Sequence, residues 1–512
     1  MMKRSLTRLL FSCCLLAVVQ LSHADSRLPA LFSDNMVLQR NTAVPIWGWA
    51  DDGEVITVSF RGQRVTTTTQ NGKWSVRLRR LKAGGPDVLT VASPSRTVEF
   101  QNVLVGEVWV ASGQSNMEWP VSQSEQPQAT AASATNSSIR FFMVPNVKSE
   151  APTVRVNSSW KVCAPDMISG YSAVAYHFAR DLQAARKVPI GIIQSDWGGS
   201  PAEVWMNRES LETNPRYLAE ILDANAEAWK NHQAALIEFE KEKAVAASKG
   251  EEFKKQPPRF GWRPTELYNG MIAPLLPYAI SGVIWYQGES NAGRAEQYRT
   301  LFADMIRNWR RDWGQGDFTF LQVQLAPWDK NRKRSLEEIT QSPGDSDWAE
   351  LREAQWLATK VLPKVGMVVI TDVGDKDDIH PRMKQPVGAR LALAARAIAY
   401  GEKIEHSGPL YASQRIEGGK IVLSFDHVGK GLEARGGQLT GFAICGEDRN
   451  FVWADAEIVG SSVVVSSPQV PKPVAVRYGW ADYPVVNLWN KDGLPASPFR
   501  TDDFPLTTAG KK

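Results

Sequence analysis

The sequence predicts an α/β protein: a doubly wound parallel sheet flanked by two smaller β-sandwich-like domains. Between residues 102 and 405, short apolar runs alternate with helical patterns, whereas only short strand-like runs occur before and after. The length of 512 residues also exceeds the roughly 250 to 300 residues of a single core. We therefore expect an N-terminal β domain at 25–101, a central α/β domain at 102–405 and a C-terminal β domain at 406–512.

The first 24 residues have the pattern of a secretion signal. Three basic residues precede a mostly apolar stretch at 9–21, and Ser22-His23-Ala24 fits a small-x-small cleavage site. The apolar stretch is shorter than the roughly 20 residues that span a bilayer, which disfavours a membrane anchor. We expect the mature chain to begin at Asp25 and to be periplasmic or extracellular.

Composition excludes several classes of protein. The hydrophobic fraction of 43% is typical of a globular chain. Removal of the signal lowers the net charge from +4 to +1, so neither nucleic acid nor an anionic membrane is an expected partner. Cys163 and Cys445 remain, and two buried free thiols are favoured over a disulfide, which sequence alone cannot establish.

The expected elements follow from periodicity and turn residues. In the N-terminal domain, strands are predicted at 55–60, 65–69 and 74–78, with Asn71-Gly72 as a tight hairpin turn between the last two. In the central domain, buried strands are predicted at 103–111, 190–195, 280–286, 318–325 and 366–371, and helices at 172–186, 295–313, 349–362 and 384–400. In the C-terminal domain, strands are predicted at 420–425, 439–445, 456–465 and 473–478.

One charged segment, 209–259, interrupts the alternation and is predicted to be an inserted helix or helical hairpin. Its charge is explained most simply by a solvated face, and a lid or partner-binding role is the alternative.

The stretch 103–120 places a serine where open α/β sheets bind ligands. Its apolar run ends at Ser112-Gly113, so the Ser115 hydroxyl is expected just past the carboxyl end of a central strand. The serine suits a nucleophile, although a serine in such a turn also caps helices.

Loops after the other strands supply the remaining groups of an acyl-transfer site. His380 follows the last predicted strand and is the expected base, with Asp377 as the carboxylate that orients it. The backbone N–H groups of Ser115 and Gly198 and the side-chain amide of Asn291 are the expected oxyanion donors.

Each assignment has a competitor in its own loop. Gly199 competes with Gly198, Asn291 could cap the following helix, and Ser290 is a rival serine. The carboxylates that compete with Asp377 are Asp372, Asp375 and Asp378. The histidines lack metal-ligand spacing such as H-E-x-x-H, so we expect no metal and no cofactor, and no G-x-S-x-G elbow is present.

The ordered blocks GQSNM, WGGS, WYQGESN and DDIHP together resemble those of SGNH hydrolases, more narrowly the sialate O-acetylesterase and carbohydrate acetylesterase branch. The resemblance covers Val103 to about Leu391, and NLWNKDGLPASPFRTD near the end is also similar. It implies a flavodoxin-like sheet, a metal-free Ser-His-Asp mechanism, release of acetate from a sugar hydroxyl, and oxyanion donors at the positions given above.

Aromatic residues near the four loops agree with an acetylated oligosaccharide or glycan as substrate. The tryptophans concerned are Trp119, Trp197, Trp205, Trp285 and Trp328, and Gln114 and Glu203 are further candidate substrate contacts. The substrate class includes acetylated sialic acid and acetylated hemicellulose such as xylan or xyloglucan. Two rival hypotheses are a non-catalytic carbohydrate-binding protein and a lipase-like esterase of the same fold.

Overall fold

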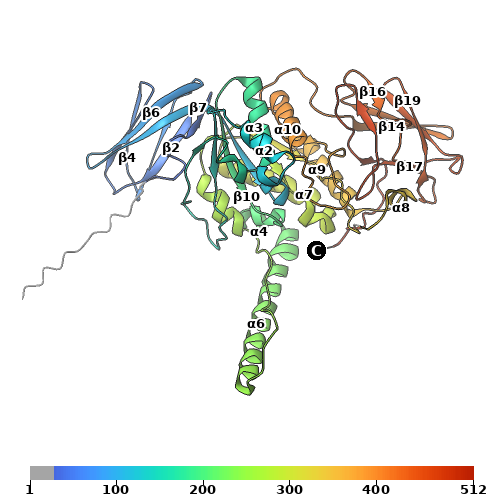
Figure 1. The fold of residues 1–512 in the computed structure, drawn as a ribbon, viewed down its shortest axis with the longest axis horizontal. Helices are drawn as coiled ribbons and strands as arrows, with labels where there is room; N and C mark the ends of the chain where they lie inside the picture. Colours follow the sequence, from blue (N-terminus) through green and yellow to red (C-terminus); the bar gives the residue numbers. More distant parts are fainter. Residues whose placement is uncertain (1–27, 332, 512) are drawn as a thin grey trace, which may run out of the picture.

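The computed structural model describes residues 28–331 and 333–511, so the predicted signal at 1–24 lies outside the described residues. A β domain lies at each end of the molecule, an α/β domain lies between them, and helix α6 extends away from the body as an arm (Figure 1). Within the described residues, no helix has the length and apolar character needed to cross a bilayer.

The central sheet is parallel across six neighbouring strands. Their order is β13-β12-β11-β7-β10-β8, and the short β9 pairs antiparallel with β8 at one edge. The strands are β7 (Thr97–Gly113), β8 (Ile139–Met143), β9 (Lys161–Val162), β10 (Ile190–Asp196), β11 (Gly282–Tyr286), β12 (Thr319–Val323) and β13 (Val365–Val368). The predicted parallel α/β sheet is thus present, with β8 as an additional strand.

Helices cover both faces of this sheet because its central strands are apolar on both sides. Along β7, Val108 and Val110 belong to the core shared with α7 and α9, whereas Trp109 and Ala111 belong to the core shared with α3 and α10. The helices are α1 (Ser115–Glu118), α2 (Pro127–Ala132), α3 (Ala173–Arg186), α4 (Arg208–Glu212), α5 (Pro215–Tyr217), α6 (Ala224–Lys249), α7 (Ala295–Trp313), α8 (Leu336–Thr340), α9 (Asp347–Val361) and α10 (Gln385–Ile398). The four helices predicted between the strands correspond to α3, α7, α9 and α10, and the predicted inserted helix to α6.

Strand β7 joins the N-terminal domain to the central sheet without a break. Its first part pairs with β6 and its last part with β10 and β11, so the predicted boundary at 101/102 falls inside one strand. The domain is built from β1 (Val37–Gln39), β2 (Val44–Trp49), β3 (Val55–Phe60), β4 (Gln63–Thr68), β5 (Lys73–Leu78) and β6 (Gly84–Ala92).

The hairpin predicted around Asn71-Gly72 is wrong, because the turn is present but the two strands that it connects do not pair with each other. Both residues adopt positive φ, and the turn closes by a Gln70–Lys73 bridge. Beyond it, however, β4 pairs with β3, and β5 pairs with β2 in the other sheet. The turn therefore crosses between the two sheets, which lets alternate residues of β5 enter the core.

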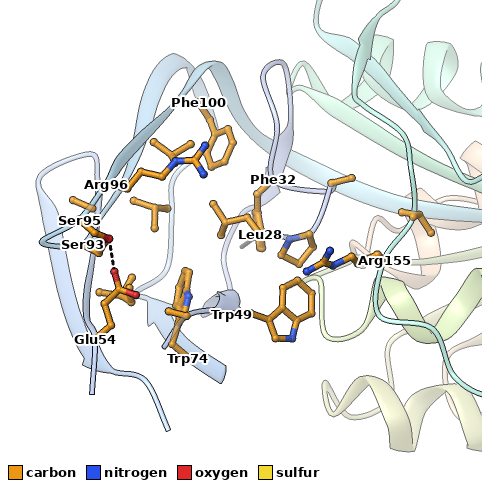
Figure 2. Close-up of a pocket in the computed structure, with 18 of the residues that line it drawn as sticks. Leu28, Phe32, Trp49, Glu54, Trp74, Ser93, Ser95, Arg96, Phe100 and Arg155 are labelled. Carbon is orange, nitrogen blue, oxygen red and sulfur yellow. Dashed lines mark hydrogen bonds between the residues drawn. The ribbon is translucent and has the colours of Figure 1, made fainter. Parts of the chain in front are cut away.

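A cavity of about 1020 Å³ opens between the N-terminal sheets and the loop around residue 155. Figure 2 shows Trp49 and Trp74 along one wall, with Arg155 beside Trp49. None of the predicted catalytic residues lines this cavity.

Over its described residues, 406–511, the C-terminal domain consists of strands and loops. They are β14 (Leu410–Glu417), β15 (Lys420–Asp426), β16 (Leu432–Ala434), β17 (Phe442–Cys445), β18 (Val452–Trp453), β19 (Asp455–Val459), β20 (Ser462–Ser466), β21 (Ala475–Tyr478), β22 (Leu488–Asn490) and β23 (Phe499–Arg500). The single strand predicted at 456–465 is wrong, because Gly460 at φ +64° turns the chain and β19 pairs with β20 as a hairpin. Cys163 and Cys445 are both free and buried, and burial raises the pKa of each thiol to about 11.

Arg352 of α9 fixes the C-terminal domain against the central domain. Its buried guanidinium donates to the carbonyls of Leu325 and Ala326 at 2.9 and 3.1 Å. It also donates to the carbonyls of Ala481 and Asp482 at 2.7 and 2.9 Å. A buried cation without these acceptors would be costly, so the four carbonyls and the arginine hold one another in place.

Candidate active site

The structure brings Ser115 and His380 into contact at the carboxyl ends of the parallel strands. Ser115 begins α1 directly after β7, and its Oγ lies 2.9 Å from Nε2 of His380, which lies in the loop between β13 and α10. Gly113 makes this turn possible, because a β-carbon there would lie 2.2 Å from the Tyr286 carbonyl oxygen. The contact is within the reach that a serine and its base require.

The carboxylate beside His380 is Asp378, which differs from the predicted Asp377. Asp378 Oδ1 accepts the His380 backbone N–H at 2.9 Å and lies 3.7 Å from His380 Nδ1. Asp377 pairs with its neighbour Lys376, and its side chain is 60% exposed. The reason is local: an aspartate that accepts the N–H two residues later turns its carboxylate toward that residue.

Gly198 lies against the serine. A β-carbon at Gly198 would lie 3.2 Å from Ser115 Cβ and 3.0 Å from Glu118 Oε2, whereas Gly199, at φ +72°, is close to Trp262 instead. Of the two glycines, Gly198 is therefore the one that lies beside Ser115. The Ser115 N–H belongs to the first turn of α1, where backbone donors have no partner within the helix.

The side chain of Glu118 is hydrogen-bonded to the backbone of Gly198. Its Oε2 accepts the Gly198 N–H at 2.6 Å, which is one of the donors that the sequence predicted for an oxyanion. A second carboxyl, Asp196, is buried nearby: burial raises its pKa well above the usual range, and the charge of Glu118 raises it further. The sequence gave no prediction for either carboxyl, although Glu118 directly follows GQSNM and Asp196 directly precedes WGGS.

Asn291 joins two of the loops. Its Oδ1 accepts the Ala202 N–H at 2.9 Å and the Gln287 side-chain amide at 2.7 Å, and its Nδ2 donates to Glu203 at 3.0 Å. The backbone donor at Ala202 fixes which way the amide points. The second Nδ2 hydrogen has no acceptor within the described part of the chain.

Two predicted substrate contacts have partners within the protein. Glu203 is buried and pairs with Arg294 at 2.7 Å in addition to Asn291. Gln114 is also buried, and its Oε1 accepts the backbone N–H groups of Gly288 and Ser290, each at 3.3 Å. Both side chains hold the loops together in the structure.

A buried network behind the serine was not predicted. The Asn116 amide donates to Glu289 at 2.7 Å and to the Ile379 carbonyl at 3.0 Å, and its oxygen accepts from Lys384 Nζ at 2.5 Å. Burial lowers the pKa of Lys384 to about 7 and raises that of Glu289. The network ties the serine, WYQGESN and histidine loops to one another. Asn116, Glu289 and Ile379 lie within the motifs and Lys384 lies three residues after DDIHP, and these positions were the available signal.

The tryptophans near the loops divide into two groups. Trp119 stacks on the His380 ring with 4.8 Å between centroids, and Trp197 is half-buried beside Gly198. Trp205 and Trp285 are fully buried and pack edge to face in the core. Trp328 is half-buried and packs on Trp348.

Two histidines that are distant in the sequence meet outside these loops. Ligand atoms of Glu405, His406 and His427 lie within 4.8 Å of one another, and Glu405 Oε1 lies 2.7 Å from His427 Nδ1. The same oxygen accepts the His406 and Ser407 backbone N–H groups at 2.9 and 3.3 Å. Hydrogen bonds within the protein thus account for this carboxylate, and none of the three residues belongs to the predicted site.

Known proteins similar to this chain agree with an esterase site. Residues 105–397 match the family model described as carbohydrate esterase, sialic acid-specific acetylesterase. The sialate O-acetylesterases of Mus musculus and Homo sapiens are 30% and 29% identical, covering 96% and 92% of this chain and 97% and 92% of their own. A carbohydrate acetylesterase from Xanthomonas citri is 41% identical, with a TM-score of 0.79 over 93% of this chain and 99% of its own.

The mixed α/β fold and these similarities identify a carboxylic ester hydrolase. The match covers more than half of the chain, and the curated relatives are similar over nearly all of it. The chain belongs to the sialic acid-specific acetylesterase family of carbohydrate esterases.

Proposed function

We propose that this protein is an exported SGNH-type carbohydrate O-acetylesterase that uses Ser115, His380 and Asp378. The observation that supports the mechanism most directly is the 2.9 Å contact between Ser115 Oγ and His380 Nε2. Export is supported by the signal pattern at 1–24.

In the first step, Ser115 Oγ attacks the acetyl carbonyl carbon and His380 Nε2 takes the hydroxyl proton. The resulting oxyanion accepts hydrogen bonds from the Ser115 and Gly198 N–H groups and from the free Asn291 Nδ2 hydrogen. Collapse of this intermediate breaks the ester bond, and His380 returns the proton to the sugar oxygen.

Water then completes the cycle. His380 removes a proton from the water, whose oxygen attacks the acetyl-enzyme carbonyl, and acetate leaves as the proton returns to Ser115 Oγ. Throughout, Asp378 favours the protonated imidazole, and Trp119 covers one face of the ring.

Glu118 must move for this reaction to occur. Its carboxylate accepts the Gly198 N–H in the structure, and a negative charge at this position would oppose an oxyanion. We propose that the arriving acetyl group displaces Glu118, whose carboxylate is then available to accept a hydrogen bond from a sugar hydroxyl.

The proposed substrate class is an O-acetylated sugar, either sialic acid or a hemicellulose unit. The relatives are named sialate O-acetylesterase or carbohydrate acetylesterase, and Trp119 and Trp197 offer indole surface beside the serine. Flat rings suit the apolar faces of sugars.

The test is acetate release from O-acetylated sialic acid, acetylated xylan and acetylated xyloglucan by wild type, Ser115→Ala and Ser290→Ala. We expect Ser115→Ala to lose at least about three orders of magnitude in turnover, because a triad serine acts with its base as a unit. Ser290→Ala controls for the rival serine and should retain turnover. Near-wild-type activity of Ser115→Ala would refute the mechanism. Faster hydrolysis of long acyl esters than of acetate esters would favour a lipase-like enzyme.

A further inference from the structure

Helix α6 and its return segment form the arm, and the return segment ends, at the base of the arm, beside the candidate active site. The return segment, 250–263, packs along α6 through the ring pairs Phe239–Phe253 and Trp229–Phe260. At the base of the arm, the Asn225 side-chain amide donates to the Trp262 carbonyl at 3.2 Å. These contacts fix the position of the Trp262 side chain.

Trp262 reaches the loop that carries the proposed oxyanion donor. Its ring packs edge to face on Trp197 with 5.2 Å between centroids. Its indole nitrogen lies 3.9 Å from the place where a β-carbon on Gly199 would be. Gly198 lies against Ser115, and Trp197 directly precedes Gly198 in the chain. The two tryptophans therefore lie at the edge of the proposed active site.

The chemistry of this group of side chains suits a sugar. Both indoles are half-buried, and neither indole N–H donates to an acceptor among the described residues. Lys148 Nζ lies 4.0 Å from the Trp262 ring centroid and 3.0 Å from Glu266, and its side chain is 41% exposed. The indole rings can cover the apolar faces of a pyranose ring, and the indole N–H groups and the partly exposed Lys148–Glu266 ion pair can form hydrogen bonds with its hydroxyls.

We propose that Trp262, Trp197 and Lys148 form a second sugar subsite, which binds a sugar residue glycosidically linked to the acetylated one. The proposal rests on the proposed esterase function and gives the inserted arm a role: it supplies one wall of the substrate site. The alternative is that the Trp197–Trp262 pair only secures the base of the arm. A subsite distant from the reacting carbonyl supplies binding shared by ground and transition states, so its loss raises KM more than it lowers kcat.

The experiment compares acetate release by wild type, Trp262→Ala and Trp262→Phe. The substrate pairs are acetylated xylotriose with acetylated xylose, and O-acetylated sialyllactose with free O-acetylated sialic acid. For Trp262→Ala, we expect the kcat/KM ratio of oligosaccharide to monosaccharide to fall about tenfold, mainly through KM, which corresponds to one buried aromatic contact. Trp262→Phe keeps a ring but loses the N–H, so a fall of about threefold is expected.

The control is Trp453→Ala, which removes a partly exposed tryptophan from the C-terminal domain and should leave both rates unchanged. Circular dichroism and thermal melting establish that each variant is folded. If Trp262→Ala does not fold, Trp262→Phe alone tests the subsite. An unchanged ratio in a folded Trp262 variant would overturn the subsite while leaving the esterase function intact. Failure of the wild type to release acetate from every sugar would overturn both proposals.

Discussion

Replacing Asp378 and Asp377 separately by asparagine tests which carboxylate supports His380. Asp378 Oδ1 lies 3.7 Å from His380 Nδ1, whereas Asp377 pairs with Lys376. Two opposite charges about 4 Å apart attract by about 1 kcal/mol in water and by about 4 kcal/mol at an effective dielectric constant of 20. The Asp378 side chain is 53% exposed, so a value between these limits, about 2 kcal/mol, is the appropriate estimate.

This energy corresponds to a loss of about 30-fold in kcat for Asp378→Asn, since each 1.36 kcal/mol changes a rate tenfold. Asp377→Asn is the matched control and should remain within about twofold of wild type. The measurement is kcat for p-nitrophenyl acetate hydrolysis at neutral pH, with thermal melting to show that both variants are folded. A larger loss in Asp377→Asn than in Asp378→Asn would refute the assignment.

Two further perturbations test the surroundings of the site. Glu118→Gln should raise kcat/KM for p-nitrophenyl acetate by about two- to tenfold. A neutral amide competes less strongly than a carboxylate for the Gly198 N–H, and it repels an oxyanion less. A decrease in kcat/KM would show that the carboxylate itself is needed. For His177, burial lowers the pKa from 6.5 to about 4, and its buried Nδ1 has no hydrogen-bond partner among the residues that the structure describes. The unfolded chain therefore binds a proton that the native state excludes, and stability should fall by about 3 kcal/mol as pH drops from 6.5 to 4. Urea unfolding across this range should show a shallower loss for His177→Gln than for wild type, and equal slopes would contradict the reasoning.

Long, strongly periodic elements were predictable from the sequence. Helix α7 was predicted at 295–313 and occupies Ala295–Trp313, because its apolar residues repeat at helical spacing. Strand β8 was missed because it is a run of only five residues, IRFFM, without a clear alternation of apolar and polar residues. The hairpin at Asn71-Gly72 was mispredicted because a turn sequence sets local geometry, whereas the choice of partner strand depends on how the two sheets pack.

The site was predictable to the extent that strand topology determines it. Ser115 and His380 both follow parallel strands, so both were expected at one edge of the sheet, and the structure places them in contact. The position of Asp378 depends on a hydrogen bond within its own loop, and spacing alone could not distinguish it from Asp377. The Glu118 contact with Gly198 joins two separate loops and has no sequence pattern of its own.

The continuity of β7 limits how this protein can be divided. The same 17-residue strand forms part of the N-terminal sandwich at its start and presents the Ser115 turn at its end. A truncation placed at residue 101 or 102 would cut a hydrogen-bonded strand and leave the first part of β7 in the central domain without its partners β1 and β6. The N-terminal domain is thus a structural extension of the catalytic sheet, and protein engineering that shortens or exchanges it would need to retain the whole strand.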